Sequence, residues 1–246
     1  MKSEPAQQQE VVATLDRALA DIAGARAYNE WLFDRIRPFL GARVVDAGAG
    51  VGTFTALAAD TGAEVTAVEP VPEFACILRE RFHGDAKVTV VEGTVEAVRH
   101  RSFDSIICLN VLEHIEDDRA TLGEFMGQLV PGGRLLLLVP AHPGLYGGYD
   151  RAAGHVRRYS KRLLTDQLVE AGFEIETLRH VNPVGALGWL VRVRLRSSEE
   201  WPASSFSLFD RAVPVLRRLD ALRLPFGLSL WAVARRVNGA AARAPR

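Results

Sequence analysis

Cysteine is scarce in this chain, and its scarcity excludes several classes of protein. Among 246 residues there are two cysteines, Cys76 and Cys108, which fit neither a disulfide framework nor a Cys-x-x-Cys motif. No run approaches the roughly 18 apolar residues that a membrane-spanning helix needs. The N-terminal sequence lacks the apolar stretch of a secretory signal peptide. We therefore expect a protein of the reducing cytoplasm.

An excess of charge of one sign is also missing. The 30 basic residues equal the 30 acidic residues, which argues against a nucleic-acid-binding protein that depends on bulk positive charge. The balance is uneven along the chain, because residues 184–246 contain 11 arginines and only four acidic residues. These arginines either solvate the outer faces of helices or, within residues 184–223, contact the surface of a membrane.

What the sequence does contain is an alternation of short β-branched runs with helix-like stretches, which is typical of a parallel sheet with crossover helices. The predicted strands cover residues 43–46, 65–68, 87–91, 103–109, 135–139, 173–181 and 228–233. The predicted helices cover residues 53–60, 70–81, about 117 to 130, and 160–171. The apolar run at 135–139 predicts a strand buried on both faces.

Two stretches lie outside this alternation and suggest how the chain is organised. Residues 1–40 carry apolar positions at helical spacing and predict an N-terminal helical lid. Residues 41–246 form the main domain, in which residues 183–224 predict a helical insertion between the last two strands. This insertion is placed to cap a substrate pocket.

A glycine-rich turn follows the first predicted strand. Glycines occupy every second position after Asp46, just before a predicted helix: Gly48, Gly50 and Gly52. Glycine lets the backbone approach a bound molecule, and a helix start offers free N–H donors at the positive end of a dipole. A dinucleotide-binding turn would place its third glycine where this chain has Thr53. The alternative is a tight turn that binds no ligand.

An acidic residue ends the second predicted strand. Glu69 lies 23 residues beyond Asp46, where a carboxylate can accept hydrogen bonds from both hydroxyls of a ribose. NAD-dependent enzymes and other adenosine-binding proteins share this placement. The glycine spacing must decide between them, and Thr53 counts against a dinucleotide.

Together these motifs resemble those of the class I S-adenosylmethionine-dependent methyltransferases. The resemblance extends from about Tyr28 to Glu176. Besides the glycine turn and Glu69, it depends on the order of four short stretches: Glu92-Gly93-Thr94, Phe103-Asp104, Asn110 to Ile115, and Pro131-Gly132-Gly133. It implies a doubly wound, Rossmann-like α/β fold with a seven-stranded, mostly parallel sheet and an antiparallel final strand.

The resemblance also implies a cofactor, S-adenosyl-L-methionine, and the residues that hold it. Asp46 and the glycine turn, including Ala49, would hold its methionine end, and Glu69 with Pro70 would hold its ribose. Thr94 departs from the aspartate that many members have beside the adenine. The other implied positions would contact adenine, flank the sulfonium or close over the cofactor: Gly93, Thr94, Val95, Asn110, Val111, His114 and Tyr28.

A long stretch without predicted structure, residues 140–159, follows the fifth strand. In open α/β sheets the ligand crevice lies beyond the carboxyl ends of the strands, so this stretch is placed to line the acceptor pocket. Its run Gly154-His155-Val156-Arg157-Arg158-Tyr159 resembles a subset of these methyltransferases, related to ubiquinone-pathway O-methyltransferases, in which a histidine faces the methyl group.

His155 is the predicted catalytic base, with Tyr149 and Arg158 as further catalytic candidates. A hydroxyl acceptor must lose its proton before or during attack, and an imidazole, whose ordinary pKa is near neutrality, suits this task. An activated sulfonium donor needs few other catalytic groups. The alternative is that His155 only caps the loop or binds Asp150. His114 either bonds to backbone or touches a ligand.

We predict no metal site. Glu113, His114, Asp117 and Asp118 have suitable ligand chemistry. Acidic residues at the start of a helix, however, commonly compensate the helix dipole.

The sequence therefore predicts an S-adenosylmethionine-dependent methyltransferase that acts on a small molecule, with a hydroxyl oxygen as the favoured acceptor. Three alternatives stay open: methylation of nitrogen or carbon in a small or lipid-like molecule, a nicotinamide-dependent enzyme of the same fold, and a non-catalytic module that binds membranes. The broad basic groove and the aromatic-basic motif expected for a polynucleotide substrate are both missing. The sequence does not predict the oligomeric state.

Overall fold

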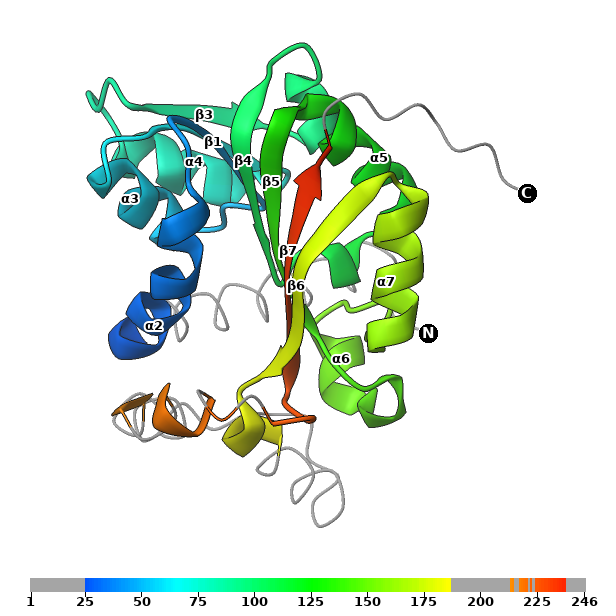
Figure 1. Ribbon diagram of the computed structural model, residues 1–246. Coiled ribbons are helices and arrows are strands. Elements are labelled where there is room, and N and C mark those ends of the chain that lie inside the picture. Colours follow the sequence, from blue (N-terminus) through cyan, green and yellow to red (C-terminus); the bar gives the residue numbers. More distant parts are fainter. Residues whose placement is uncertain (1–24, 187–212, 215–216, 221, 223, 238–246) are drawn as a thin grey trace, which may run out of the picture.

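A computed structural model describes residues 25–186, 213–214, 217–220, 222 and 224–237. A mixed sheet of seven strands runs through these residues in the order β3-β2-β1-β4-β5-β7-β6 (Figure 1). Its strands are β1 (Arg43–Ala47), β2 (Glu64–Glu69), β3 (Val88–Glu92), β4 (Phe103–Leu109), β5 (Leu129–Pro140), β6 (Phe173–Val181) and β7 (Ser229–Arg236). Only β7 is antiparallel to its neighbours, β5 and β6. The predicted fold class is confirmed.

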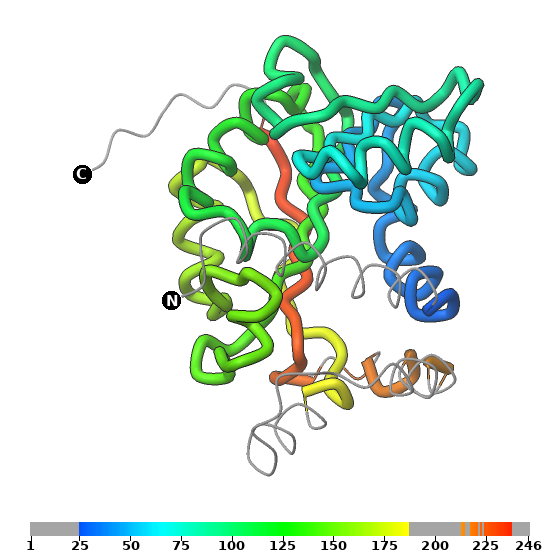
Figure 2. The backbone as a smooth tube through the Cα atoms, turned by 180° about the vertical axis from the view of Figure 1, so that it is seen from behind, coloured from blue at the N-terminus to red at the C-terminus, as the bar shows by residue number. Residues whose placement is uncertain are grey.

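Helices cover both faces of this sheet (Figures 1 and 2). One face carries α2 (Arg26–Ile36), α3 (Thr53–Asp60) and α4 (Pro72–Arg81). The other face carries α5 (Asp118–Gln128) and α7 (Lys161–Glu170), whereas the short α6 (Gly148–Ala152) follows the carboxyl end of β5. The described chain also has single 3-10 turns: η1 (Arg37–Phe39), η2 (Val95–Val98), η3 (Leu112–His114) and η4 (Pro143–Leu145).

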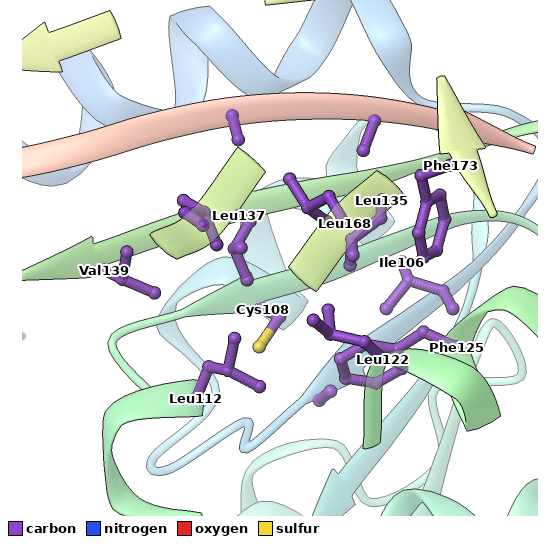
Figure 3. Close-up of a cluster of buried hydrophobic side chains, with 14 of the residues drawn as sticks. Ile106, Cys108, Leu112, Leu122, Phe125, Leu135, Leu137, Val139, Leu168 and Phe173 are labelled. Atoms are coloured by element: carbon purple, nitrogen blue, oxygen red, sulfur yellow. The ribbon is translucent and has the colours of Figure 1, made fainter. Parts of the chain in front are cut away.

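The core consists of two apolar layers, one on each face of the sheet. Successive side chains of a strand point to opposite faces, so Ile106 and Cys108 face α5 while Ile107 faces α2 and α3. Figure 3 shows Leu122 and Phe125 of α5 in the same buried cluster as these β4 side chains. Residues 135–139 are at most 1% exposed, as expected for a strand covered on both faces.

Three predicted elements differ from the structure, and one is the last strand, since β7 spans Ser229–Arg236 rather than residues 228–233. β5 begins at Leu129 rather than Leu135, because the Pro131-Gly132-Gly133 stretch is absorbed as an irregularity in the pairing between β4 and β5. The stretch 140–159 is not without structure, since it contains η4 and α6. Such short helices have too few residues to show a clear periodicity in the sequence.

The predicted lid and insertion lie partly outside the described residues. Of the lid at residues 1–40, the structure describes α2, which ends near Pro38 as predicted. Of the insertion at residues 183–224, it describes helical backbone at 183–186 and 217–220. The division into a lid and a main domain therefore stays a prediction. Within the described residues, no helix has the length and apolar character to cross a bilayer.

Candidate active site

The glycine turn lies at the carboxyl end of β1. Gly48, Gly50 and Gly52 all have left-handed backbone, with φ values of 72°, 54° and 81°. The N–H groups of Gly48 and Ala49 both donate to the Val68 carbonyl, at 2.8 and 3.1 Å, which folds the turn over the end of β2. A Cβ atom at Gly48 would lie 2.5 Å from Cγ2 of Val111. The turn therefore requires glycine there for both backbone conformation and space.

Two buried carboxylates flank this turn. Asp46 accepts a hydrogen bond from the Thr55 hydroxyl at 2.6 Å, and burial raises the pKa of Asp46 to about 6. Glu69 accepts from the backbone N–H groups of Gly50 at 2.8 Å and Val71 at 2.9 Å, and burial raises its pKa. Neither carboxylate pairs with a described Arg or Lys. Within the described residues, this turn thus carries negative charge without a cationic side chain to balance it.

The next strand ends complete this edge. Gly93, with φ of 135°, donates its N–H to the Glu69 carbonyl at 2.9 Å, and Thr94 and Val95 follow as the start of η2. Asn110 has left-handed backbone, and its N–H donates to the Leu138 carbonyl at 2.8 Å. The predicted cofactor residues of β1 to β4 thus gather at one edge of the sheet.

Two other predicted cofactor residues, Ala49 and Pro70, adjoin this edge, and a third, Tyr28, lies on α2. Ala49 is buried in the turn against Ala67 and Leu78, and Pro70 is exposed directly after Glu69. Tyr28 lies on α2, with its ring centroid 5.7 Å from that of Trp31, and burial raises the pKa of Tyr28 to about 12. Burial in α2 therefore disfavours ionisation of this phenol.

A second cluster, centred on Asp150, lies beyond β5. Its Oδ1 atom is 2.8 Å from Nδ1 of His155 and accepts from Nε of Arg158, also at 2.8 Å. Its Oδ2 atom accepts from the Gly147 N–H at 2.9 Å, which joins the cluster to the start of α6. Burial opposes ionisation of Asp150, but the hydrogen bonds from His155 and Arg158 outweigh it and lower its pKa.

The three predicted catalytic residues meet in this cluster in different ways. The His155 side chain is 11% exposed, whereas that of Arg158 is 2% exposed and also donates to the Ala141 carbonyl at 3.3 Å. Arg158 is therefore placed to hold Asp150. The Tyr149 ring lies edge-on to His155, with 6.4 Å between centroids. Asp150, which the sequence predicts as an acceptor-pocket residue or a structural partner of His155, is the group on which the others converge.

Glu113 is a site residue that the sequence analysis did not place here. Its side chain is buried, its Oε2 atom has no hydrogen-bond partner among the described residues, and burial raises its pKa to about 8. The adjacent His114 ring lies 4.8 Å from the His155 ring, and burial followed by the charge of His155 lowers the pKa of His114 to about 4. His114, predicted to contact the cofactor, thus lies beside the predicted base.

Ligand atoms of Glu113, His114 and His155 all lie within 4.8 Å of one another, a spacing that could hold a metal ion. The acidic pair weighed from the sequence lies elsewhere. Asp117 caps α5 by accepting from the Ala120 N–H, and Asp118 binds Arg157, Tyr159 and Gln167. That the chain uses no metal stays a prediction.

A family comparison decides between the enzyme classes that fit this geometry. The model of the family described as "Methyltransferase domain" matches residues 14–178, which include the glycine turn, Glu69 and the Asp150 cluster. This chain belongs to that family. The chain therefore carries a methyltransferase domain, and S-adenosylmethionine is the cofactor that its motifs imply.

Curated relatives of the methyltransferase include two proteins named ubiquinone biosynthesis O-methyltransferase. The one from Xanthomonas axonopodis pv. citri (strain 306) is 35% identical over 113 residues, which cover 44% of this chain and 46% of the relative. The one from Xylella fastidiosa (strain 9a5c) is 36% identical over 107 residues, covering 41% and 42%. The match thus spans less than half of each relative.

Solved structures share the fold of the methyltransferase at low sequence identity. An S-adenosylmethionine-dependent methyltransferase from Mesorhizobium loti superposes with a TM-score of 0.57 at 19% identity, over 80% of this chain and 92% of that one. Phosphoethanolamine N-methyltransferase 2 from Haemonchus contortus, solved with S-adenosyl-L-methionine, gives 0.59 at 18% identity, over 84% and 52%. These likenesses establish the fold alone.

Proposed function

We propose that the methyltransferase transfers a methyl group to a hydroxyl oxygen of a small molecule, with His155 as the base. The observation that carries this proposal is the 2.8 Å contact between Nδ1 of His155 and the Asp150 carboxylate. A carboxylate accepts a hydrogen bond from Nδ1–H, so Nε2 of the neutral ring keeps the lone pair that takes a proton. The names of the curated relatives also favour oxygen as the acceptor atom.

The described residues fit the cofactor that the family uses. Each carboxylate oxygen of Glu69 accepts one hydrogen bond from a backbone N–H group. Each oxygen therefore keeps a lone pair that can accept a hydrogen bond from a ribose hydroxyl. Asp46 presents a buried carboxylate with no cationic partner in the described chain, which suits the ammonium group of a methionine moiety. When bound, S-adenosylmethionine supplies an activated methyl group. Gly93, Thr94 and Val95 would contact its adenine, and Asn110 and Val111 would flank its sulfonium.

The residues around His155 then have separate duties. His155 removes the hydroxyl proton of the acceptor, and the ionised Asp150 stabilises the imidazolium that results. Arg158 holds Asp150 in place from the buried side. Tyr149, on α6 with Asp150, lies edge-on to the His155 ring and would contact the acceptor beside it. An acceptor that is already nucleophilic, such as an unprotonated amine, would need no base to remove a proton before attack.

Replacement of the predicted base tests the proposal. In His155→Ala we expect S-adenosylmethionine affinity within about twofold of wild type and a fall of roughly 10²- to 10⁴-fold in turnover of hydroxyl acceptors, the usual contribution of a general base. Calorimetry measures the affinity, and transfer of a labelled methyl group to phenolic, quinol, sugar and amine acceptors measures turnover. His100→Ala, at an exposed position, is the matched control.

The same experiment separates the alternatives. Retained turnover of amine acceptors in His155→Ala would favour nitrogen methylation, and retained turnover of hydroxyl acceptors would contradict the proposed base.

Residues 184–223 lie mostly outside the described residues, so their contact with a membrane stays a prediction. A cytoplasmic location also stays a prediction. Both described cysteines are free thiols, which agrees with a reducing compartment.

A further inference from the structure

One buried carboxylate joins the insertion to the lid helix. Asp220 is 4% exposed and forms ion pairs with Arg35 of α2 and with Arg179 of β6, where Nη1 and Oδ2 are 3.3 Å apart. Its Oδ1 atom accepts a hydrogen bond from the Asn182 N–H at 3.2 Å. A single side chain thus connects three segments that are far apart in the sequence: α2, the end of β6 and residues 217–220.

Arg35 carries this link to the face of α2 that holds Tyr28. Its guanidinium lies 4.2 Å from the centroid of the Trp31 ring and donates to the Trp31 carbonyl at 2.9 Å. Trp31, which is 4% exposed, packs against Val213 of the insertion and against Tyr28. The aromatic face of α2 is therefore held between Asp220 and Val213. In Figures 1 and 2 the described residues 213–214 and 217–220, drawn in orange, lie beside α2 in both views.

We propose that Asp220 is a positioning residue of the methyltransferase: by holding Arg35 it fixes α2, and with it Tyr28, at the methyl-donor site. This inference relies on the proposed role of Tyr28 in covering the cofactor. Loss of one partner of a buried ion pair leaves the other charge uncompensated, and here two arginines would be left. The unpaired guanidiniums would then turn toward water and release α2.

The protein provides a matched control for this link. Asp34 of α2 pairs with Arg217 at 2.9 Å, so it joins the same two segments, but the two side chains are 49% and 42% exposed. Exposed ion pairs contribute little to stability because water screens them. Asp34→Asn therefore removes a bond between the lid helix and the insertion without leaving a buried charge.

Two substitutions, Asp220→Asn and Arg35→Gln, test the proposal in the full chain. In both we expect S-adenosylmethionine to bind about tenfold more weakly or worse, because α2 loses its link to residue 220. Asp220→Asn also leaves two arginines unpaired, whereas Arg35→Gln leaves Asp220 paired with Arg179. We expect turnover at saturating cofactor to recover to within about threefold, since the chemistry at His155 is untouched. Amide hydrogen exchange should accelerate in residues 26–36 but stay unchanged in β4 and β5. The double variant should bind S-adenosylmethionine no more weakly than Asp220→Asn does, because both single substitutions remove the same interaction between Asp220 and Arg35.

Several outcomes would overturn this inference. Unchanged affinity and exchange in Asp220→Asn would show that α2 does not depend on this carboxylate. Accelerated exchange throughout the sheet would show that Asp220 merely stabilises the whole fold, and equal losses in Asp34→Asn would remove the distinction between buried and exposed links. Wild-type protein that binds no S-adenosylmethionine would instead contradict the proposed function, and exchange in residues 26–36 would still report whether Asp220 fixes α2.

Discussion

Burial changes the chemistry of individual side chains at this site, and Glu113 is the clearest case. Its carboxyl group is removed from water, has no hydrogen-bond partner at Oε2 among the described residues, and has a pKa of about 8. It is therefore largely neutral at pH 7, unlike the ionised Asp150 nearby. Two carboxyl groups in one cluster thus hold different protonation states because only one of them receives hydrogen bonds from cationic side chains.

The raised pKa of Glu113 predicts how stability depends on pH. The folded protein keeps this proton up to about pH 8, whereas the unfolded chain loses it near 4.5, so ionisation of Glu113 lowers the free energy of unfolding as pH rises between those values. Glutamine cannot ionise. In Glu113→Gln, the free energy of unfolding relative to wild type should therefore increase from pH 5 to pH 8.5, as measured by urea unfolding.

Glu64→Gln is the control, since Glu64 is exposed at the first position of β2 and the substitution removes the same charge. The change with pH should be larger for Glu113→Gln than for this control. A change no larger than that of the control would contradict the raised pKa of Glu113.

Which site residues could be foreseen depends on how local their signal is. The glycines stand out because their turn directly follows the first strand. Glu69 stands out because it ends the second strand. The partnership of Glu113 with His155 joins residues about forty positions apart, and nothing in the sequence near either residue encodes it. The sequence predicts Arg158 as catalytic, and the folded chain shows its guanidinium enclosed against Asp150.

At the scale of elements, the turn between β1 and α3 depends on contact with a distant segment. Gly48 packs its backbone against Val111 after β4, so the turn and the β4 end fit together only without a side chain at position 48. The predicted bounds agree best with the structure where residues that end strands or helices mark them clearly. β4 and β6 have the predicted bounds, and the predicted end of α3 is followed by the left-handed Gly62, whereas β5 extends through a Pro-Gly-Gly stretch that normally ends strands.

Substitution of this glycine should separate binding from stability. Gly48→Ala adds a left-handed alanine, at about 1–2 kcal/mol, and forces Val111 away, at about 1–3 kcal/mol more. Gly62→Ala has the same backbone cost, with φ of 96°, but nothing within 4 Å of its Cβ. We expect urea unfolding to show a larger loss for Gly48→Ala, and calorimetry to show weakened cofactor binding only there. Equal effects would mean that the close contact with Val111 is unimportant.

For the whole molecule, the family and the fold agree on one type of ligand. The family model and the sheet order are those of methyltransferases, whereas a nicotinamide cofactor would use the same crevice with different glycine spacing. The global fold could be predicted because strand and helix patterns alternate regularly. The lid and insertion could not be placed, because amphipathic helices reveal a buried face but not its partner.

Ligand binding to the folded state should raise the melting temperature in a selective way. S-adenosylmethionine at 100 times its dissociation constant should add about 2.7 kcal/mol to stability, which corresponds to roughly 5–10 °C for a chain of this size. Thermal melting measures the shift. NADH at the same concentration should produce none, and a shift with NADH but not with S-adenosylmethionine would contradict the assigned cofactor.

The place where the chain leaves and re-enters the sheet has a consequence for how such enzymes diversify. The Leu228 N–H donates to the Asn182 carbonyl at 3.0 Å, so the segment between β6 and β7 starts and finishes at one point. Because loop closure costs little more for a longer loop, that segment can be lengthened without a shift in the register of β6 and β7. A foreign segment grafted between positions 182 and 228 would, however, have to keep Asp220, because the proposed hold on α2 would otherwise be inherited by none of its descendants.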